Sequence, residues 1–324
     1  MSFKIIHSDS LTALQSVKDS GIVSTVYFDP PFNTGRDFTM SPDDKTGFGD
    51  KFDSDSDYES LIDPIVAECH RLLKEDGSFF FHISAAEMLI PHKVCSKYFS
   101  HIQPIFWQRS RSKNNVKKKL GSVVDVIFWC SKGKKRKYNL VYQKLDDYYA
   151  TNSYKNKDER GSYALGHIVY SRTQKSKDKS RYYKVELGEK TFNPEYGWRV
   201  SQQDLQALIE DNRIHVPQKR GNLYRKIYMH ESKGKPATNL WDDIHSIAMG
   251  SEERKYPTQK PLMLLERIIE MSSDPGDLVL DPMAGSGTTG IAALKLGRTV
   301  VLIDRNPDAI EIMERKINSL TEMS

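Results

Sequence analysis

The sequence predicts an α/β protein with a mostly parallel central sheet and an inserted domain. Short apolar runs of strand length alternate with longer amphipathic stretches toward both ends of the 324-residue chain, which is the pattern of helices that cover a sheet. Residues 138–235 differ, because they are polar, rich in Tyr and Lys, and without a clean period. We therefore expect a core formed by residues 1–137 and 236–324, and a separate domain formed by residues 138–235.

The first strands and the first helix come early in the chain. Residues 3–6 (FKII) are expected to form a short buried strand, and the helix that follows can be capped by Asp9 or Ser10. Residues 23–28 (VSTVYF) are expected to form a second buried strand that leads directly into the turn DPPFNTG. Residues 36–58 are full of Asp, Ser and Gly, so we expect a mobile loop at the carboxyl end of this strand.

The alternation of helices and strands continues up to the insert. Residues 58–77 predict an amphipathic helix that ends at a glycine cap, and residues 78–84 (SFFFHIS) predict a strand buried on both faces. Two further strands are expected at residues 102–107 and 123–130, separated by a basic loop. These strands are expected to join the same sheet.

The alternation of helices and strands resumes after the insert. In chain order the sequence predicts a helix at 260–273, a strand at 277–282, a glycine-rich turn leading into a helix at 284–297, a strand at 298–304 and a helix at 306–320. Within the insert, the one clear helix is residues 201–211. Its start is marked by Ser201 and Asp204, a variant of the capping box.

Composition limits the class of protein. The three cysteines have no spacing typical of a metal site or of a disulfide framework, so a reduced compartment is expected (Cys69, Cys95 and Cys130). No uncharged apolar run reaches membrane-spanning length, and the first residues lack a signal-peptide pattern, so we expect a cytoplasmic protein. The formal net charge is only +5, but the Lys and Arg residues are unevenly placed, which favours a polyanionic partner.

The stretch DPMAGSGTTG indicates a cofactor site. Gly285, Gly287 and Gly290 satisfy GxGxxG between a strand and a helix, and Asp304 ends the next strand, where an acid can bind ribose hydroxyls. A dinucleotide fold would need further strand and helix units after this motif. Asp281 would also put an anion beside a pyrophosphate, whereas it suits the ammonium of a methionine. S-adenosyl-L-methionine is therefore favoured over a nicotinamide dinucleotide, and a side chain at Gly287 is expected to fill space that the methionine needs.

The stretch DPPF indicates a catalytic site. It follows the second strand, at the sheet edge where open α/β folds keep their active sites. If the Asp29 carboxylate and the Pro30 carbonyl each accept one hydrogen of an aromatic amine, the nitrogen lone pair turns out of the ring plane. Pro31 makes the turn rigid, and Phe32 offers a flat face to a base that has left the duplex. We predict methyl transfer by positioning and fixed electrostatics, although Asp-Pro pairs also occur in plain turns.

Taken in order, the motifs resemble a known family. DPPFNTG, a variable polar stretch, YPTQKP, DPMAGSGTT and LIDRNPD resemble the β-class amino-methyltransferases of DNA, in which the catalytic motif precedes the cofactor motif. The likeness covers residues 1–135 and 236–324 and is specific as a set. It implies a Rossmann-like methyltransferase fold with permuted motif order, a target-recognition domain inserted at residues 138–235, and frequent homodimers.

The resemblance also assigns roles to single residues. The catalytic tetrad would be Asp29, Pro30, Pro31 and Phe32, with Phe32 in place of the commoner Tyr. The cofactor-binding residues would be Asp9, Thr258, Gln259, Lys260, Asp281, Ala284, Gly285, Gly287 and Asp304. Asp9 would contact the adenine of the cofactor, although a helix cap explains this residue equally well. Met283 stands where the family often has an aromatic against the cofactor.

Basic residues indicate where a nucleic acid would bind. Between residues 109 and 137 there are eleven basic residues against one acid, Asp125, and we expect this run to adjoin the catalytic edge. The predicted DNA-contacting residues are Arg109, Arg111, Lys113, Lys117, Lys118 and Lys119. In the insert, six further Lys and Arg between residues 172 and 184 mix with tyrosines (Tyr170, Tyr182 and Tyr183), as a nucleic-acid face would require.

The resemblance limits the target to an amino group of adenine or cytosine but does not decide between the two bases. In the family, DPP with an aromatic usually accompanies adenine, so N6 of adenine in double-stranded DNA is the favoured target and N4 of cytosine stays open. Two less favoured hypotheses are an RNA methyltransferase and an inactive DNA-binding protein with the same fold. A homodimer and a companion restriction endonuclease are further partners to test.

Overall fold

The structure is a computed structural model, and it divides into two compact units. The larger unit comprises Met1–Gln143 and Pro236–Ser324, and the smaller comprises Lys144–Lys235. The residues that it describes are 2–39, 47–110, 120–218, 221–247 and 258–322. Residues 138–143 stay with the larger unit because Asn139 is bonded to the end of a core helix, through its backbone N–H to Met271 O at 2.8 Å.

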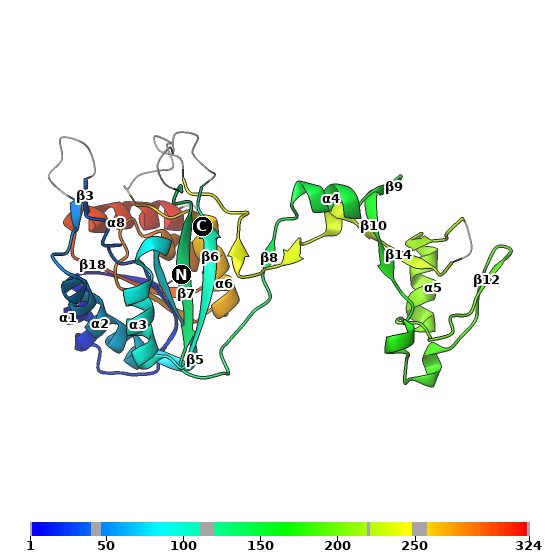
Figure 1. The fold of residues 1–324 in the computed structure, drawn as a ribbon, viewed down its shortest axis with the longest axis horizontal. Coiled ribbons are helices and arrows are strands. Elements are labelled where there is room, and N and C mark those ends of the chain that lie inside the picture. The colour runs from blue at the N-terminus through cyan, green and yellow to red at the C-terminus, as the bar shows by residue number, and fades with distance from the viewer. Residues whose placement is uncertain (1, 40–46, 111–119, 219–220, 248–257, 323–324) are drawn as a thin grey trace. The chain divides into compact units, whose positions relative to one another are not determined.

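The larger unit is built on one eight-stranded sheet (Figure 1). In spatial order its strands are β1 (Phe3–His7), β18 (Thr299–Asp304), β17 (Leu278–Asp281), β2 (Val23–Phe28), β5 (Leu73–Ser84), β7 (Val124–Ser131), β6 (His101–Gln108) and β16 (Leu240–Trp241). Neighbours are parallel except where β7 pairs with β5 and β6. The prediction of an α/β fold with a mostly parallel sheet is confirmed.

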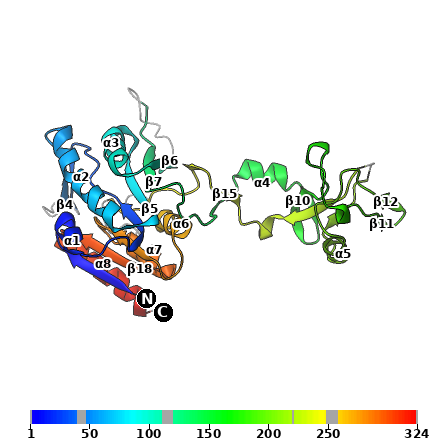
Figure 2. The same cartoon turned by 90° about the horizontal axis from the view of Figure 1, so that it is seen from below.

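Helices cover both faces of this sheet (Figure 2). One face carries α1 (Ser10–Ser16), α2 (Asp55–Leu72) and α3 (Leu89–Tyr98), and the other carries α6 (Leu262–Ser272), α7 (Thr288–Lys295) and α8 (Pro307–Glu322). A short 3-10 turn, η1 (Ala85–Glu87), precedes α3. None of the helices in the described ranges is long and apolar enough to cross a membrane.

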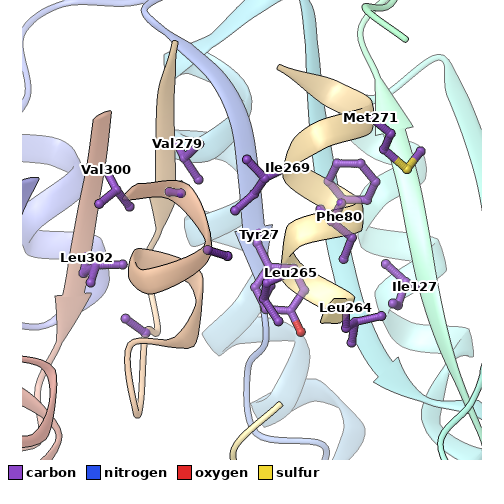
Figure 3. Close-up of a cluster of buried hydrophobic side chains, with 14 of the residues drawn as sticks. Tyr27, Phe80, Ile127, Leu264, Leu265, Ile269, Met271, Val279, Val300 and Leu302 are labelled. Carbon is purple, nitrogen blue, oxygen red and sulfur yellow. The ribbon is translucent and has the colours of Figure 1, made fainter. Parts of the chain in front are cut away.

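Covering both faces explains why the central strands are apolar throughout. Every residue of β2 is buried, and successive side chains point to opposite faces. Tyr27 packs beside Leu265 and Ile269 of α6 (Figure 3), whereas Val26 and Phe28 join the core under α2 and α3. The turn that follows this strand is therefore held by a rigid support.

The N-terminal strand departs from the expectation. The sequence predicts a buried strand, but β1 lies at the edge of the sheet, and its residues are exposed or half-buried. An edge strand has a neighbour on one side only, so its apolar side chains are covered in part. The following helix begins as expected, with Asp9 Oδ1 accepting from Thr12 N at 3.1 Å.

Two further local expectations are wrong. α2 ends at Leu72 rather than at a glycine cap, because Leu73 is extended, buried and paired with Val23, so that Gly77 lies inside β5. Residues 36–58 are not all loop either. β3 (Arg36–Thr39) and β4 (Gly47–Asp50) form an antiparallel hairpin. Each strand has only four residues, and together they are rich in Asp and Gly, so neither shows the alternation of apolar and polar residues by which a strand is predicted.

The smaller unit has its own sheet and core. Its elements are α4 (Asp147–Ser153), β9 (Asn156–Asp158), β10 (Gly161–His167), η2 (Arg172–Gln174), η3 (Lys179–Arg181), β11 (Val185–Leu187), β12 (Lys190–Phe192), α5 (Gln202–Glu210), β13 (Ile214–His215), β14 (Tyr224–Tyr228) and η4 (Met229–Glu231). A separate two-stranded sheet pairs β8 (Tyr142–Gln143), which belongs to the larger unit, with β15 (Lys235–Pro236), which lies at the boundary between the units in the sequence. The predicted helix is confirmed, because Ser201 Oγ accepts from Asp204 N at 3.0 Å and donates to its carboxylate at 2.6 Å.

Candidate functional site

A cavity of about 400 Å³ opens at the carboxyl ends of the parallel strands. β17 lies between β2 and β18, so the turns that follow these three strands emerge side by side. The predicted catalytic and cofactor residues that line the cavity are Asp9, Asp29, Pro30, Pro31, Phe32, Thr258, Gln259, Lys260, Asp281, Ala284, Gly285 and Asp304. Two motifs that are far apart in the chain therefore meet in one cavity, of a size that suits a small-molecule ligand.

Asp29 presents its two carboxylate oxygens to different surroundings. Oδ2 accepts from Lys260 Nζ at 2.5 Å, and both side chains are mostly buried. Oδ1 is buried and has no hydrogen-bond partner within the described part of the chain. An unpaired buried acceptor costs about 1–3 kcal/mol, so Oδ1 is a candidate position for a donor on a ligand. Lys260, assigned to the cofactor by resemblance, lines the cavity, contacts Asp29 and lies 5.1 Å from the centre of the Phe32 ring.

Asp50 holds the turn that follows Phe32, and sequence reasoning missed it. Its carboxylate accepts from Asn33 N at 2.6 Å, from Thr34 N at 3.2 Å and from Thr34 Oγ1. Asn33 has a φ of 57°, a left-handed conformation that residues with a side chain rarely adopt, so these bonds offset local strain. Asp50 ends the β3–β4 hairpin, which periodicity did not reveal, and no sequence signal connected it to the turn.

A second group that sequence reasoning missed lies behind Asp29. His82, on β5, is fully buried, and its Nδ1 is 2.6 Å from Tyr27 Oη and 3.9 Å from Asp29 Oδ1. Its Nε2 is 3.5 Å from Asp125 Oδ2, and Asp125 Oδ1 accepts from Arg109 Nε at 2.9 Å. A histidine in the apolar run SFFFHIS was the available signal, because such a polar side chain in a doubly covered strand needs partners.

Asp281 is a buried carboxylate whose charge is poorly compensated. Burial, together with the charges of Asp29 and Asp304, raises its pKa to about 7, despite hydrogen bonds from Thr289 Oγ1 at 2.6 Å and Met283 N at 3.1 Å. Both of these donors are neutral. A cationic group in the cavity would favour the ionised carboxylate, so the residue fits an ammonium ligand.

Two further acids at the cavity have structural partners. Asp304 accepts from Gly285 N and from Asn306 N, each at 2.8 Å, and so ties the glycine turn to the end of β18. Asp9 caps α1 through Oδ1, which accepts from both Thr12 N and Thr12 Oγ1, while it also lines the cavity. The helix cap and a place at the ligand site are thus compatible in this residue.

Gly287 does not line the cavity, unlike Gly285. It has a φ of 72° at the start of α7, and a Cβ there would lie 2.5 Å from Met313 Cγ on α8. A side chain at this position would first meet Met313, and its effect on the space needed by the ligand stays a prediction. Glycine is required at this position because the backbone is left-handed and because α7 and α8 pack closely there.

Replacing Gly287 with alanine is expected to destabilise the apo protein by about 2–4 kcal/mol, because overlap with Met313 adds to the backbone cost. Gly21→Ala is a matched control. Gly21 has a φ of 64°, and a Cβ there would meet nothing within 4 Å, so about 1 kcal/mol is expected. Urea unfolding of both variants measures the difference. Equal losses in the two would contradict the role given to Met313.

The charge of the cavity selects the kind of ligand. Its lining includes five carboxyl groups (Asp9, Asp29, Asp50, Asp281 and Asp304) and three cationic side chains (Lys51, Lys260 and Arg305), so acids are in excess. An anionic pyrophosphate would meet repulsion here, whereas a ligand with sulfonium and ammonium charges would be attracted. Within the described ranges there is no cluster of three or more His, Cys, Asp or Glu that could hold a metal ion.

The predicted DNA contacts can be placed only in part. Arg111, Lys113, Lys117, Lys118 and Lys119 lie outside the described residues. Arg109 is described, and its guanidinium donates to Asp125 and to Ser122 O at 3.2 Å, with about a third of the side chain exposed. Its bond to a buried acid gives Arg109 a structural role at the sheet edge.

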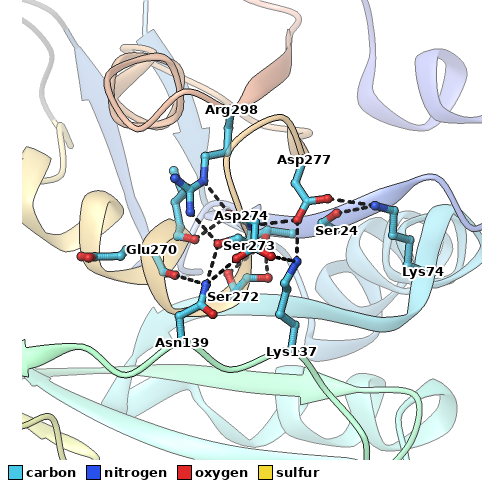
Figure 4. Close-up of polar contacts among 12 residues, drawn as sticks. Ser24, Lys74, Lys137, Asn139, Glu270, Ser272, Ser273, Asp274, Asp277 and Arg298 are labelled. Atoms are coloured by element: carbon cyan, nitrogen blue, oxygen red, sulfur yellow. Dashed lines mark hydrogen bonds and ion pairs between the residues drawn. The ribbon is translucent and has the colours of Figure 1, made fainter.

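The end of the basic run, residues 132–137, lies at the amino ends of the parallel strands, whereas the cavity lies at their carboxyl ends. β7 is antiparallel to its neighbours, so the chain leaves it at the amino ends of the parallel strands. There Lys137 Nζ pairs with Asp274 at 2.5 Å and Asp277 at 3.1 Å, and Lys74 Nζ also contacts Asp277 (Figure 4). The expectation that the whole run adjoins the catalytic edge is therefore wrong for residues 132–137.

Aromatic and basic residues of the smaller unit divide into two groups. Tyr183 stacks on Trp198 in the core and donates from Oη to Val200 O at 3.0 Å. Tyr182 is exposed, as are the Lys and Arg side chains of residues 172–179. The exposed group keeps the composition of a nucleic-acid face, whereas Tyr183 supports the fold.

The cysteines are all unpaired and buried (Cys69, Cys95 and Cys130). Burial raises the pKa of the Cys69 thiol well above its usual range, so this side chain packs as a small apolar group in the core under α2.

Comparison with known proteins gives matches over most of the chain. A family model described as DNA methylase matches residues 23–315. DNA adenine methyltransferase YhdJ of Escherichia coli (strain K12) is 28% identical over 320 residues, which are 99% of this chain and 84% of that protein. Type II methyltransferase M.EcaI of Enterobacter cloacae is 28% identical over 308 residues, 93% of this chain and 66% of that protein. The solved PvuII DNA methyltransferase (cytosine-N4-specific) has the same fold, with a TM-score of 0.54 at 15% identity, covering 97% of this chain and 86% of that one.

Proposed function

The chain belongs to the DNA methylase family, and on this basis we propose that it transfers a methyl group from S-adenosyl-L-methionine to N6 of adenine in double-stranded DNA. The observation that carries the proposal is the acid-lined cavity in which Asp29 and Asp281 meet. The similarity to an adenine methyltransferase over 99% of the chain supports adenine as the base.

The glycine-turn side of the cavity would hold the cofactor. The buried carboxylate of Asp281 would pair with the ammonium of the methionine moiety, and Asp304 would accept from ribose hydroxyls. The backbone at Gly285, with a φ of 51°, permits close approach. When bound, S-adenosyl-L-methionine supplies an electrophilic methyl group carried on a sulfonium.

The DPPF side would hold the base. Asp29 Oδ1, which has no partner in the described structure, would accept one amino hydrogen, and the Pro30 carbonyl would accept the other. The nitrogen lone pair would then turn out of the ring plane and could attack a methyl donor held on the glycine-turn side. Phe32 would stack on the base, which must leave the duplex before its amino group can enter the cavity. These fixed acceptors would stabilise the positive charge that develops on nitrogen.

Cofactor affinity is expected to rise between pH 6 and pH 7.5. Because burial raises the pKa of Asp281 to about 7, a more acidic solution protonates the carboxyl and removes the partner of the ammonium. Each pH unit below the pKa should weaken binding by up to about tenfold. Isothermal titration calorimetry across this range provides the measurement. A flat pH profile would show that Asp281 is not the ammonium partner.

We assign recognition of the DNA target sequence to the unit Lys144–Lys235. Its exposed Lys and Arg side chains at residues 172–179 can contact phosphates. Removing charge there should weaken DNA binding and reduce its salt dependence, without changing the affinity for the cofactor. The proposal includes DNA contacts from Arg111, Lys113, Lys117, Lys118 and Lys119. Association as a homodimer and action beside a restriction endonuclease are further parts of the proposal.

The decisive experiment incubates the purified protein with tritiated S-adenosyl-L-methionine and either duplex DNA or total RNA. Nucleoside mass spectrometry then identifies the product. We expect N6-methyladenine in DNA. N4-methylcytosine would move the target to cytosine, label in RNA would change the polymer, and binding of DNA without any methylated base would identify an inactive DNA-binding protein.

A further inference from the structure

The buried imidazole of His82 lies directly behind the carboxylate assigned to the target base. We infer that Tyr27 and Asp125 hold His82 in the tautomer with its proton on Nε2, so that Asp29 Oδ1 stays available to the amino group of the base. His82 is thus a positioning residue. The inference rests on the proposed function, because it concerns the carboxylate assigned to the base.

The ring of His82 is fixed in place by its surroundings. The side chain is 0% exposed, and it lies among the rings of Tyr27, Phe32 and Trp107, whose centroids are 6.0, 5.6 and 5.5 Å away. Close packing leaves no space for the ring to turn over without moving these neighbours. Its tautomer is therefore decided by the groups that face the two ring nitrogens.

Tyr27 faces Nδ1 and can donate to it. Its hydroxyl oxygen is 2.6 Å from that nitrogen. Burial raises the pKa of Tyr27 well above its usual value, and the negative charge of Asp29 raises it further, so the hydroxyl keeps its proton. A hydroxyl that keeps its proton can donate to Nδ1, and this is the arrangement in which Nδ1 carries the lone pair.

Asp125 determines the role of Nε2. Its Oδ2 is 3.5 Å away, which is longer than an ordinary hydrogen bond, so its influence is mainly electrostatic. Burial acts to raise the pKa of Asp125, but the contacts with His82 and Arg109 outweigh it and hold that pKa below its usual value. An ionised carboxylate can only accept, and it favours an N–H on the nitrogen that faces it.

The tautomer decides what Asp29 can bind. His82 Nδ1 is 3.9 Å from Asp29 Oδ1. With a lone pair on Nδ1, the imidazole offers no proton to that oxygen, and Lys260 occupies Oδ2. The opposite tautomer would place the positive end of an N–H bond near Oδ1. At 3.9 Å this is too long for a hydrogen bond, but its electrostatic attraction would weaken the pull of Oδ1 on the amino hydrogen of the base.

The test replaces Asp125 with asparagine, whose amide can donate to Nε2 and so favours the tautomer with its proton on Nδ1. We expect kcat to fall at least about tenfold, with the KM for DNA and the cofactor Kd changed less than about twofold. Long-range ¹H–¹⁵N spectra of protein with ¹⁵N-labelled histidine report the tautomer. The His82 signals are assigned by their loss in His82→Gln, and they should change from the Nε2–H to the Nδ1–H pattern in Asp125→Asn.

Asp243→Asn is the matched control. Asp243 accepts from Arg267 at 2.6 and 2.8 Å, and both side chains are about 8% exposed, so this substitution breaks a comparable buried pair away from His82. It should lower stability but leave kcat and the His82 signals unchanged. If Asp125→Asn does not fold, Tyr27→Phe removes the donor to Nδ1 and should lower kcat with a mixed tautomer signal.

The inference is overturned if the unsubstituted protein shows the Nδ1–H pattern, or if Asp125→Asn, or Tyr27→Phe in its place, keeps full turnover. These results are separate from a failure of the proposed function. That failure would appear as no methylated DNA with the unsubstituted protein, whatever the tautomer of His82.

Discussion

Asp29→Ala is expected to lower kcat for methyl transfer by at least about 10³-fold. The substitution removes the carboxylate that accepts an amino hydrogen of the base, a contact that strengthens as charge develops on nitrogen. Asp29→Asn should retain more activity, because an amide still offers one acceptor oxygen. Single-turnover kinetics with duplex DNA measures the methyl-transfer rates, which should decrease in the order Asp29, Asp29→Asn, Asp29→Ala. Similar rates in all three proteins would remove Asp29 from the reaction.

Lys260 provides the control for this experiment. Its ammonium is paired with Asp29, so Asp29→Ala leaves an uncompensated positive charge beside a cationic ligand. Cofactor affinity should fall a few fold in Asp29→Ala and recover in the double variant with Lys260→Met, while kcat stays low in both. Recovery of kcat in the double variant would mean that the charge of Lys260, rather than the lost carboxylate, caused the defect.

Asp281→Asn is expected to weaken cofactor binding by about 10²-fold or more at pH 7.5, because it removes the charged partner of the ammonium. The same change should stabilise the apo protein. Burial raises the pKa of Asp281 from 3.8 to about 7, so between these values the folded state holds a proton that the unfolded state has lost. Stability of the unsubstituted protein therefore falls as pH rises from about 4 to 7, and this loss is absent in the variant.

The stabilising effect of Asp281→Asn should be on the order of 2–4 kcal/mol above pH 7 and vanish near pH 4. Denaturant unfolding of the apo protein at several pH values measures it. Asp277→Asn is a control that should change the free energy of unfolding in the opposite direction. Hydrogen bonds from Asp274 N, Lys74 and Lys137 hold the pKa of Asp277 below its usual value despite its burial, so this substitution should cost stability at neutral pH. Equal pH profiles for both variants would contradict the burial argument for Asp281.

Much of the fold follows from local patterns in the sequence. Val23–Phe28 and Leu278–Asp281 are apolar runs of strand length that end at turn residues, and both form central parallel strands. The capping residues Asp9 and Ser201 mark helix starts correctly. Because carboxyl ends of parallel strands share one edge, the meeting of the DPPF and glycine motifs could also be predicted.

The parts that could not be predicted depend on long-range partners. Nothing near Asp50 in the sequence shows that its carboxylate accepts from the backbone of Asn33 and Thr34. His82 is held by neighbours on β2, β6 and β7 and in the turn after β2. Gly287 is constrained by Met313 on a later helix. The direction of β7 also has no local signature, although it decides on which edge the basic residues fall.

The pairing of β1 with β18 has a consequence for synthesis on the ribosome. Phe3 lies opposite Val300, and Ser10 Oγ donates to Pro282 O at 2.6 Å. β1 therefore stays unpaired until about 300 further residues have been synthesised, with its backbone edge and apolar side chains uncovered in the meantime. The nascent chain can complete its binding pocket only after Asp304 has been synthesised, so shorter chains would expose an unpaired β1 to chaperones and proteases.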